Sequence, residues 1–281
     1  MKFYTVSQIV SSPHRRGSKV KTSVGMYGSR SPLPAHGMTG FTLVELAIVV
    51  VVIGLVIGGV VVGKSLLRSS EVMSITAEYS AYKQAIGNFN DKYQALPGDF
   101  AAASTVWSGI TNGDGNGLVT VNISATRLDE QFLAWQHLQK AEMIKGNYTG
   151  TAGTAGVRDR VIGTNIPASQ LNGAGWGLIS VTLTDIAGGY TEIPYTAPDT
   201  APNHVLWFGG NSVSGTVDSQ KPVLTPIEAL DIDKKSDDGL PGHGKIIAQA
   251  NGGTGTCSSS ATAYDTSSKS ILCSLVFKTG F

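Results

Sequence analysis

The chain has 281 residues, of which 41% are hydrophobic and 15% are charged. This is enough for one substantial domain and an additional non-globular segment. The net charge of +1 excludes a chain that is basic throughout, but it hides an asymmetry. Residues 1–40 contain no acidic side chain, whereas the rest of the chain holds 15 basic and 20 acidic ones. The basic residues of this first segment are Lys2, Arg15, Arg16, Lys19, Lys21 and Arg30.

The basic segment is followed by a long apolar run. Residues 46–63 form 18 consecutive positions without a charged side chain. That length predicts a transmembrane helix. A buried core helix is the alternative, but such a helix is rarely apolar on every face. A basic segment beside an apolar run is typical of membrane targeting and does not indicate nucleic-acid binding. The positive charge predicts a cytoplasmic N-terminal side, so residues after Gly63 are expected to be exported.

A short motif stands between these two segments. Gly40 is followed by Phe41, by Thr-Leu-Val, and then by Glu45, the charged residue at the entrance of the apolar run. In a secretory signal peptide the small residue at the cleavage site follows the apolar core. Here Gly40 precedes it. Cleavage after Gly40 would therefore remove the basic segment and keep the apolar helix.

The motif resembles that of the type IV prepilins, a family that includes pilus subunits and the pseudopilins of type II secretion. The resemblance implies that a prepilin peptidase cleaves after Gly40 and methylates the new N-terminal Phe41, and that Glu45 is needed for filament assembly. The matching residues are Gly40, Phe41, Thr42, Leu43, Val44, Glu45 and Leu46, with Gly54 further along.

The chain departs from the family pattern in two respects. Many members have a proline that kinks the helix where this chain has Val62, so a weaker kink is expected. The leader of 40 residues is also long, and an internal start at Met26 would shorten it. The true start codon stays open between Met1 and Met26.

Glu45 has two interpretations. An ionisable group at the centre of a bilayer costs roughly 2.5–3.5 kcal/mol or more, so it usually has a partner. The amine of Phe41 in a neighbouring subunit is one such partner. Alternatively, a carboxylate in the first turn of a helix is favoured by the helix dipole, by about 0.3–1 kcal/mol.

The helix is expected to continue beyond Lys64 as an amphipathic segment. Apolar residues recur there at steps of three and four, and Leu96-Pro97-Gly98 is a stop signal. A helix from about Thr42 to Tyr93 would be roughly 80 Å long. We expect its apolar stripe to pack on a sheet of the same chain, with a coiled coil as the alternative. The stripe consists of Val72, Ile75, Tyr79, Tyr82, Ile86, Phe89 and Tyr93.

The exported part is predicted to be an α+β domain. A second helix is expected over residues 127–145, with Thr126 as its cap and Gly146 as its stop. Runs typical of strands then follow, separated by Gly, Pro and Asn. Strands that follow a helix favour an antiparallel sheet. The predicted strands are 177–186, 204–209, 244–250 and 271–278. The family has the same architecture, a long N-terminal helix with its second half on an antiparallel sheet.

The chain thus divides into four parts. Residues 1–40 form the basic leader, 41–63 the apolar helix, 64–96 its amphipathic continuation and 97–281 the exported domain. The two cysteines, Cys257 and Cys273, are in the last part. In an exported domain a pair is most simply a disulfide, with two buried thiols as the alternative. The resemblance implies a C-terminal disulfide loop on the outer surface of a filament.

Two segments are candidates for calcium binding. The first contains Asn112, Asp114 and Asn116, but Ile123 occupies the position where an EF-hand has Glu. Asp129 or Glu130 could supply a further ligand. The second contains the carboxylates Asp231, Asp233, Asp237 and Asp238, which repel one another unless a cation intervenes. Lys234 and Lys235 could neutralise them without metal. A polar turn is the preferred interpretation of both segments.

The sequence has no catalytic signature. GxSxG, HExxH, P-loop and dinucleotide-binding patterns are absent, and His137 beside Trp135 is expected to be a surface or core histidine. We therefore expect a pilin and not an enzyme. Its implied partners are copies of itself or other pilins, the prepilin peptidase, and the inner-membrane assembly platform with its ATPase. It would reside in the inner membrane and, once assembled, in a filament.

Three alternatives to a structural pilin remain, and the sequence leaves open whether such a subunit would be major or minor. Two lie within the same class, namely a minor pilin and a type II secretion pseudopilin. The third is a membrane-anchored exported binding protein or adhesin that never polymerises.

Overall fold

The computed structural model describes residues 40–120, 129–154, 159–181, 203–211, 221–250 and 256–281. The chain divides into two units, Met1–Ile53 and Gly54–Phe281. The expected leader, except for Gly40, lies outside the described residues. The elements discussed below all belong to the second unit, apart from the first part of the N-terminal helix.

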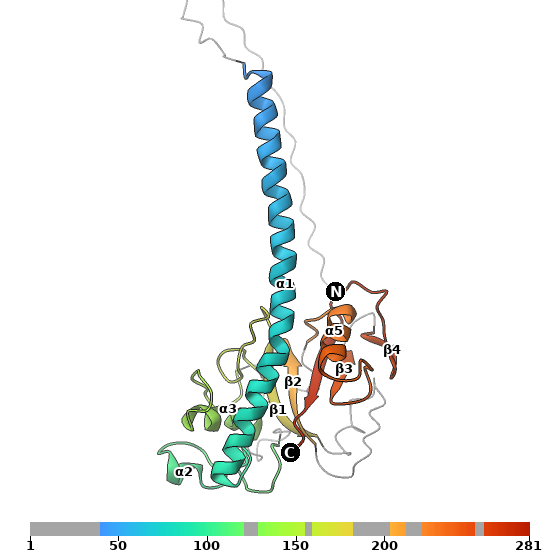
Figure 1. Ribbon diagram of the computed structural model, residues 1–281. Helices are drawn as coiled ribbons and strands as arrows, with labels where there is room; N and C mark the ends of the chain where they lie inside the picture. Colours follow the sequence, from blue (N-terminus) through green and yellow to red (C-terminus); the bar gives the residue numbers. More distant parts are fainter. Residues whose placement is uncertain (1–39, 121–128, 155–158, 182–202, 212–220, 251–255) are drawn as a thin grey trace, which may run out of the picture. The chain divides into compact units, whose positions relative to one another are not determined.

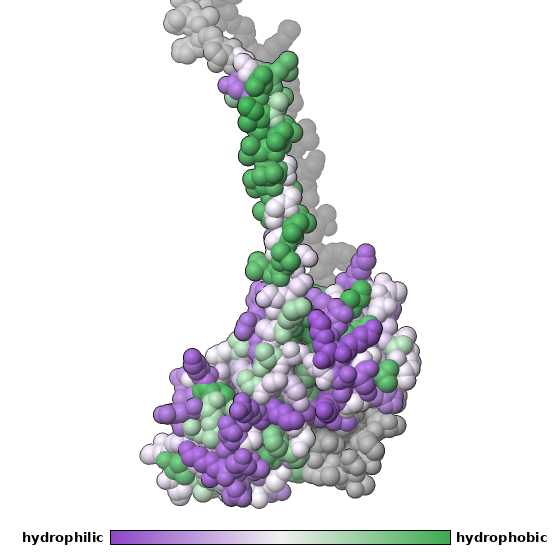
Figure 2. Space-filling view, viewed as in Figure 1, coloured by the Kyte–Doolittle hydropathy of each residue, from purple (hydrophilic) through white to green (hydrophobic). Residues whose placement is uncertain are grey.

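Helix α1 spans Leu43–Tyr93 and is 51 residues long, which confirms the predicted long helix (Figure 1). Its first half is apolar on all sides. Every large aliphatic side chain from Leu43 to Val62 is at least half exposed, and Figure 2 shows these side chains as a continuous apolar surface along the helix. By length and composition α1 can cross a membrane. This is the feature of a membrane-anchored protein.

The other end of α1 is set by backbone geometry. Gln94 adopts a positive φ of 53°, and its N–H donates to the carbonyl of Asn90. Pro97 and Gly98 follow, and Gly98 has φ 96°. The predicted stop is thus confirmed, with the last helical residue three positions before Leu96.

The domain contains a four-stranded antiparallel sheet in the order β1-β2-β6-β3. The four predicted strands are present, although residues 182–186 lie outside the described part. A small second sheet, which was not predicted, pairs β4 with β5. The strands are β1 Gly175–Val181, β2 Asn203–Gly209, β3 Ile246–Ala250, β4 Ser258–Ser260, β5 Ala263–Tyr264 and β6 Cys273–Lys278.

The main sheet buries side chains on both faces, because alternate residues of a strand point to opposite sides. One face belongs to the main core, which also contains the stripe of α1. The other face forms a smaller apolar cluster made of Ile179, Val205, Trp207, Ile247 and Val276. The side chains of the first face are Trp176, Leu178, Leu206, Phe208, Ile246, Ala248, Leu275 and Phe277.

The second half of α1 packs on the first face of this sheet, as the apolar stripe predicted. Tyr79 stacks on Phe277 with ring centroids 4.8 Å apart, and its hydroxyl donates to the carbonyl of Lys278. The rings of Tyr82 and Trp176 also pack together, with centroids 5.8 Å apart. The indole N–H of Trp176 donates to Oε2 of Glu78 at 2.7 Å. Aromatic packing and hydrogen bonds together fix this half of the helix on the sheet.

Two shorter helices, α2 and α3, follow α1 in the chain. Helix α2 comprises Ala103–Val106, and α3 comprises Glu130–Lys140. Helix α3 occupies the middle of the segment 127–145 in which a helix was predicted. The predicted cap Thr126 lies outside the described residues. Buried Trp135 packs edge-on against Tyr82, with ring centroids 5.2 Å apart, so α3 is part of the same core as α1.

Helix α5, Pro226–Ser236, corrects an expectation from the sequence. The segment from Asp231 was interpreted as a loop, but Asp231 and Asp233 lie in this helix. Thr225 caps it. The Thr225 hydroxyl accepts from the N–H of Glu228, whose carboxylate accepts from the N–H of Thr225. This reciprocal capping box, with a proline in the first turn, explains why the helix begins here.

An ion pair connects α1 to α5. The Arg68 guanidinium donates to both carboxylate oxygens of Glu228, at 2.7 and 3.0 Å, and to the carbonyl of Val223 at 2.8 Å. Bidentate geometry makes this the stronger type of ion pair. The predicted disulfide between Cys257 and Cys273 is present, with Cα atoms 5.0 Å apart. It encloses the β4–β5 hairpin.

Candidate functional site

The N-terminal motif lies at the start of α1. Gly40 and Phe41 precede the helix, and both are exposed. A Cβ added to Gly40 would meet no atom within 4 Å. Among the residues that the structure describes, the expected cleavage position is therefore accessible, and a side chain at Gly40 would make no packing contact.

Glu45 forms a capping box with Thr42. Its Oε2 accepts from the Thr42 N–H and from the Thr42 hydroxyl, each at 2.9 Å. The hydroxyl in turn accepts from the Glu45 N–H at 3.2 Å. These bonds satisfy N–H groups that the first turn of a helix leaves unpaired. The local role weighed for Glu45 thus has a definite structural form, and the spacing Thr-x-x-Glu was its sequence signal.

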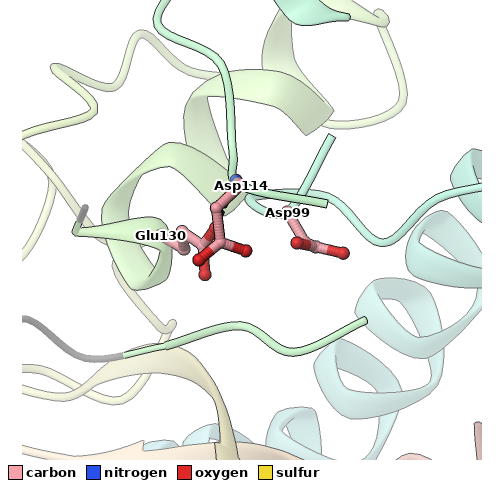
Figure 3. A group of neighbouring side chains, drawn as sticks. All are labelled: Asp99, Asp114 and Glu130. Carbon is pink, nitrogen blue, oxygen red and sulfur yellow. Dashed lines mark hydrogen bonds between the residues drawn. The ribbon is translucent and has the colours of Figure 1, made fainter. Parts of the chain in front are cut away.

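Three carboxylates form a first acidic cluster in the domain: Asp99, Asp114 and Glu130. One oxygen from each lies within 4.8 Å of the others. Figure 3 shows them side by side, from the loop after α1, the loop 111–120 and the first turn of α3. Asp99 and Glu130 are buried, whereas Asp114 is exposed.

Two glycines allow this arrangement. A Cβ on Gly113 would clash with the Gly98 carbonyl oxygen and with the Asp99 backbone. Gly98 itself has a positive φ, and a Cβ there would lie 2.5 Å from the carbonyl oxygen of Glu130. Close backbone contact therefore brings Asp99 and the loop around Asp114 to the start of α3.

Backbone N–H groups hold the buried carboxylates in place. Asp99 accepts from the N–H groups of Asn116 and Gly117, at 2.8 and 2.9 Å. Glu130 accepts from Asp114 N–H and from the N–H and hydroxyl of Thr120. Burial nevertheless raises the pKa of Asp99 to about 6, and burial also raises the pKa of Glu130. Calcium binds about six to eight oxygen atoms, and the three carboxylates could supply part of such a set.

The structure separates the predicted ligands of the first segment. Asp114 belongs to the cluster, and Glu130 supplies the further carboxylate that was weighed with Asp129. The side chain of Asn112 instead accepts from Ser104 N–H. Asn116 directs its amide to Asp114. Asp99 was missed, because it is 15 residues from Asp114 and only the folded backbone brings the two together.

The second acidic cluster contains Asp233, Asp237 and Asp238, without Asp231. Its carboxylates serve as acceptors within the fold. Asp233 accepts from the Tyr264 hydroxyl at 2.7 Å and from Gly239 N–H. Asp237 accepts from the N–H groups at the start of β3. This cluster thus links α5 to β3 and to the hairpin inside the disulfide loop. Burial raises the pKa of Asp233 to about 6.

His137 is a core histidine, one of the two expected environments. Its Nδ1 accepts from Gly98 N–H at 3.1 Å, so Nε2 carries the proton and donates to the Thr111 carbonyl. Burial lowers its pKa. Both nitrogens are used in holding the loops that carry Asp99 and Asp114, which gives His137 a structural role.

Comparison of the chain with protein-family models, with curated proteins and with solved structures found no match. A long apolar N-terminal helix, whose second half packs on an antiparallel sheet, is compatible with a pilin-like fold.

Protonation of Asp99 is expected to stabilise the metal-free chain as the pH falls from 7 to 5, whereas buried His137 and His204, whose pKa values are lowered, act in the opposite direction. The pKa of Asp99 is about 6 in the folded state against an ordinary 3.8, so between these values the folded state binds the additional proton. The contribution of Asp99 to stability is therefore gained as the pH falls through 6 and lost as it rises. Asp99→Asn should remove this contribution by removing the titration.

This pH response can be measured by circular dichroism on the detergent-solubilised chain in the presence of a chelator. Asp231→Asn is the control, because Asp231 is exposed and belongs to neither cluster. It should keep the wild-type change in melting temperature. An equal change in melting temperature for the wild type and for Asp99→Asn would contradict the raised pKa of Asp99.

Proposed function

We propose that the chain is a structural pilin, a subunit of a type IV pilus or a related pseudopilus that is matured by a prepilin peptidase and assembled into a helical filament. One observation carries the proposal. The exposed apolar half of α1 is preceded by Gly40, Phe41 and Thr42 and has Glu45 in its first turn. The other half of the same helix belongs to the core of the domain.

The exposed apolar half must be covered in the working protein. Burial of apolar surface is worth about 25 cal/mol per Å², and contiguous exposed apolar surface on this scale marks a membrane or protein contact. Two environments meet this need in succession. The lipid bilayer covers the helix of the single subunit, and neighbouring helices cover it in the filament core.

The proposed life cycle defines the partners. The peptidase cleaves and methylates the subunit in the inner membrane. An assembly platform driven by an ATPase then transfers it into a filament of like subunits. The disulfide supports export of the domain, because such bonds persist in oxidising compartments. Pilus, pseudopilus and minor-pilin roles share every one of these steps.

The alternative from another class is an anchored exported binding protein or adhesin that does not polymerise. Such a protein would have the same helix and an exported domain. It would have no use for cleavage at Gly40, since an apolar anchor functions with its leader attached. Processing therefore distinguishes the two functions.

The mature chain is expected to begin at a methylated Phe41, and Gly40→Leu should leave the uncleaved precursor in the membrane. Intact mass and N-terminal peptide analysis measure both. Gly58→Ala is a matched control, because a Cβ at either glycine meets no atom within 4 Å. It should be processed normally. A mature chain that begins after residue 63 would indicate an ordinary signal peptide and overturn the proposal.

Glu45 is expected to pair with the Phe41 amine of a neighbouring subunit in the filament. Glu45→Val removes both the charge and the capping box, whereas Glu45→Gln removes the charge but leaves a side chain that can complete the box. Both variants should be cleaved and inserted, and neither should form filaments alone. An amine left unpaired in an apolar core costs several kcal/mol, compared with about 0.5–2 kcal/mol for a lost cap.

The two substitutions separate the roles when sheared filaments are quantified by electron microscopy and immunoblotting. Normal filaments from Glu45→Gln alone, with none from Glu45→Val, would assign Glu45 to helix capping only. Normal filaments from both variants would show that assembly needs neither the charge of Glu45 nor its capping box.

We also propose that calcium binds the first acidic cluster. Its three carboxylates repel one another, two of them are buried, and the ion pairs among the described residues include none to Asp99, Asp114 or Glu130. A divalent cation would remove this repulsion. The second cluster has less need of one, because only one of its three carboxylates, that of Asp233, is buried.

Calcium is expected to raise the melting temperature of the solubilised chain at pH 7. Saturation at about 100 times the dissociation constant corresponds to roughly 2.7 kcal/mol of stabilisation. Asp114→Asn should abolish the effect. Asp238→Asn, which changes an equally exposed carboxylate of the second cluster, should preserve it. An unchanged melting curve of the wild-type chain in millimolar calcium would exclude calcium binding.

A further inference from the structure

Three exposed aliphatic side chains surround the place where α1 meets α5. Leu67 precedes Arg68 in the chain and Ile227 precedes Glu228, so each is next in sequence to one member of the ion pair. Ile271 precedes Leu272. Their side chains are 66%, 45% and 56% exposed, respectively. We name these three residues the junction patch.

Hydrogen bonds join the three segments that carry the patch. Arg68 binds Glu228 and the carbonyl of Val223. The next residue, Leu224, accepts from Leu272 N–H at 2.9 Å, and it also pairs with Cys273. The disulfide fixes Cys273 in turn. The junction patch therefore lies on a part of the domain whose segments are linked by hydrogen bonds and by the disulfide.

The junction patch lies a short distance along α1 from the end of the apolar run. Arg68 is five residues beyond Gly63, which corresponds to about 7.5 Å of helix rise. The headgroup region on one side of a bilayer is about 5–8 Å thick. When the apolar half of α1 spans a membrane, the patch is consequently at the level of the lipid headgroups.

The charges around the patch fit an anionic surface. Lys64, Lys221 and Lys269 are exposed and lie within a few residues of Leu67, Val223 and Ile271. The carboxylate of Glu228 is paired with Arg68. The acidic residues Glu71 and Asp231 come one helical turn later along α1 and α5. Apolar side chains with adjacent lysines are the composition of surfaces that lie in a membrane interface.

We infer that the junction patch docks the domain on the anionic lipid surface beside its own transmembrane helix. This inference rests on the proposed function only in that the subunit is resident in a membrane. The lipid surface is continuous with the apolar half of α1, so docking extends the anchor from the helix to the domain. Transfer of the subunit out of the membrane then requires the patch to leave the lipid.

The test places a polarity-sensitive NBD fluorophore on single cysteines in the full chain. Ile227→Cys and Ile271→Cys probe the patch. Val106→Cys is the matched control, an aliphatic residue of α2 that is 48% exposed and lies outside the patch. Ile57→Cys reports insertion of the apolar half. The native cysteines are bonded to each other and do not react. The labelled chains are reconstituted into phosphatidylglycerol-containing vesicles with nitroxide lipids.

Headgroup-level nitroxide should quench positions 227 and 271 several-fold more than position 106, and deep nitroxide should quench position 57. Lys221→Glu combined with Lys269→Glu should reduce quenching at 271 in anionic vesicles. Equal quenching at 106, 227 and 271, with position 57 quenched, would overturn docking while leaving the anchor intact. An unquenched position 57 would overturn the anchor and docking together. Quenching at 227 and 271 that depends on protein concentration at fixed lipid would assign the patch to contact between copies.

Discussion

The structure depends on a single constraint, which is that one helix has two incompatible surroundings. The first half of α1 is apolar on every face, and its large side chains are exposed. The second half has a narrow apolar stripe that packs on the sheet through Tyr79 and Tyr82, and Phe89 of the same stripe contacts Phe100 and Trp107. No break separates the halves, because backbone hydrogen bonding continues from Leu43 to Tyr93. One helix therefore contains both the exposed apolar part and the part that belongs to the core of the domain.

The coupling is reinforced where the character of the helix changes. Val72 is the first buried residue of α1, and Arg68 one turn earlier is held by Glu228 and by Val223. Glu228 also completes the capping box of α5, so one carboxylate both starts that helix and binds α1. Val223 and Leu224 pair with Cys273, which belongs to the disulfide. A continuous set of bonds thus connects α1 to the disulfide loop.

The sequence allowed the architecture to be predicted where local signals agree. Helix α1 was expected from about Thr42 to Tyr93, and it spans Leu43–Tyr93. The prediction was possible because an uncharged run is followed by apolar residues at steps of three and four and then by the stop signal Leu-Pro-Gly. Helix α5 was missed although Thr225, Pro226 and Glu228 are a start signal. Its last turns are rich in Asp and Lys and were interpreted as a turn. Asp99 had no local signal at all. Its place beside Asp114 results from the contact between Gly98 and Gly113, which no spacing along the chain encodes.

The capping box also bears on the assembly role that we propose for Glu45. Thr42 satisfies two acceptor positions on Oε2. A carboxylate has about four acceptor positions, so Oε1 keeps its lone pairs while the box is intact. Hydrogen bonds from neutral groups leave the negative charge in place. That charge is tolerable near the membrane surface but expensive in the apolar core of a filament. The local and the inter-subunit roles are therefore compatible. The box fixes the direction of the carboxylate within the chain. In the filament that we propose, the remaining charge would be compensated by a cation from a neighbouring subunit.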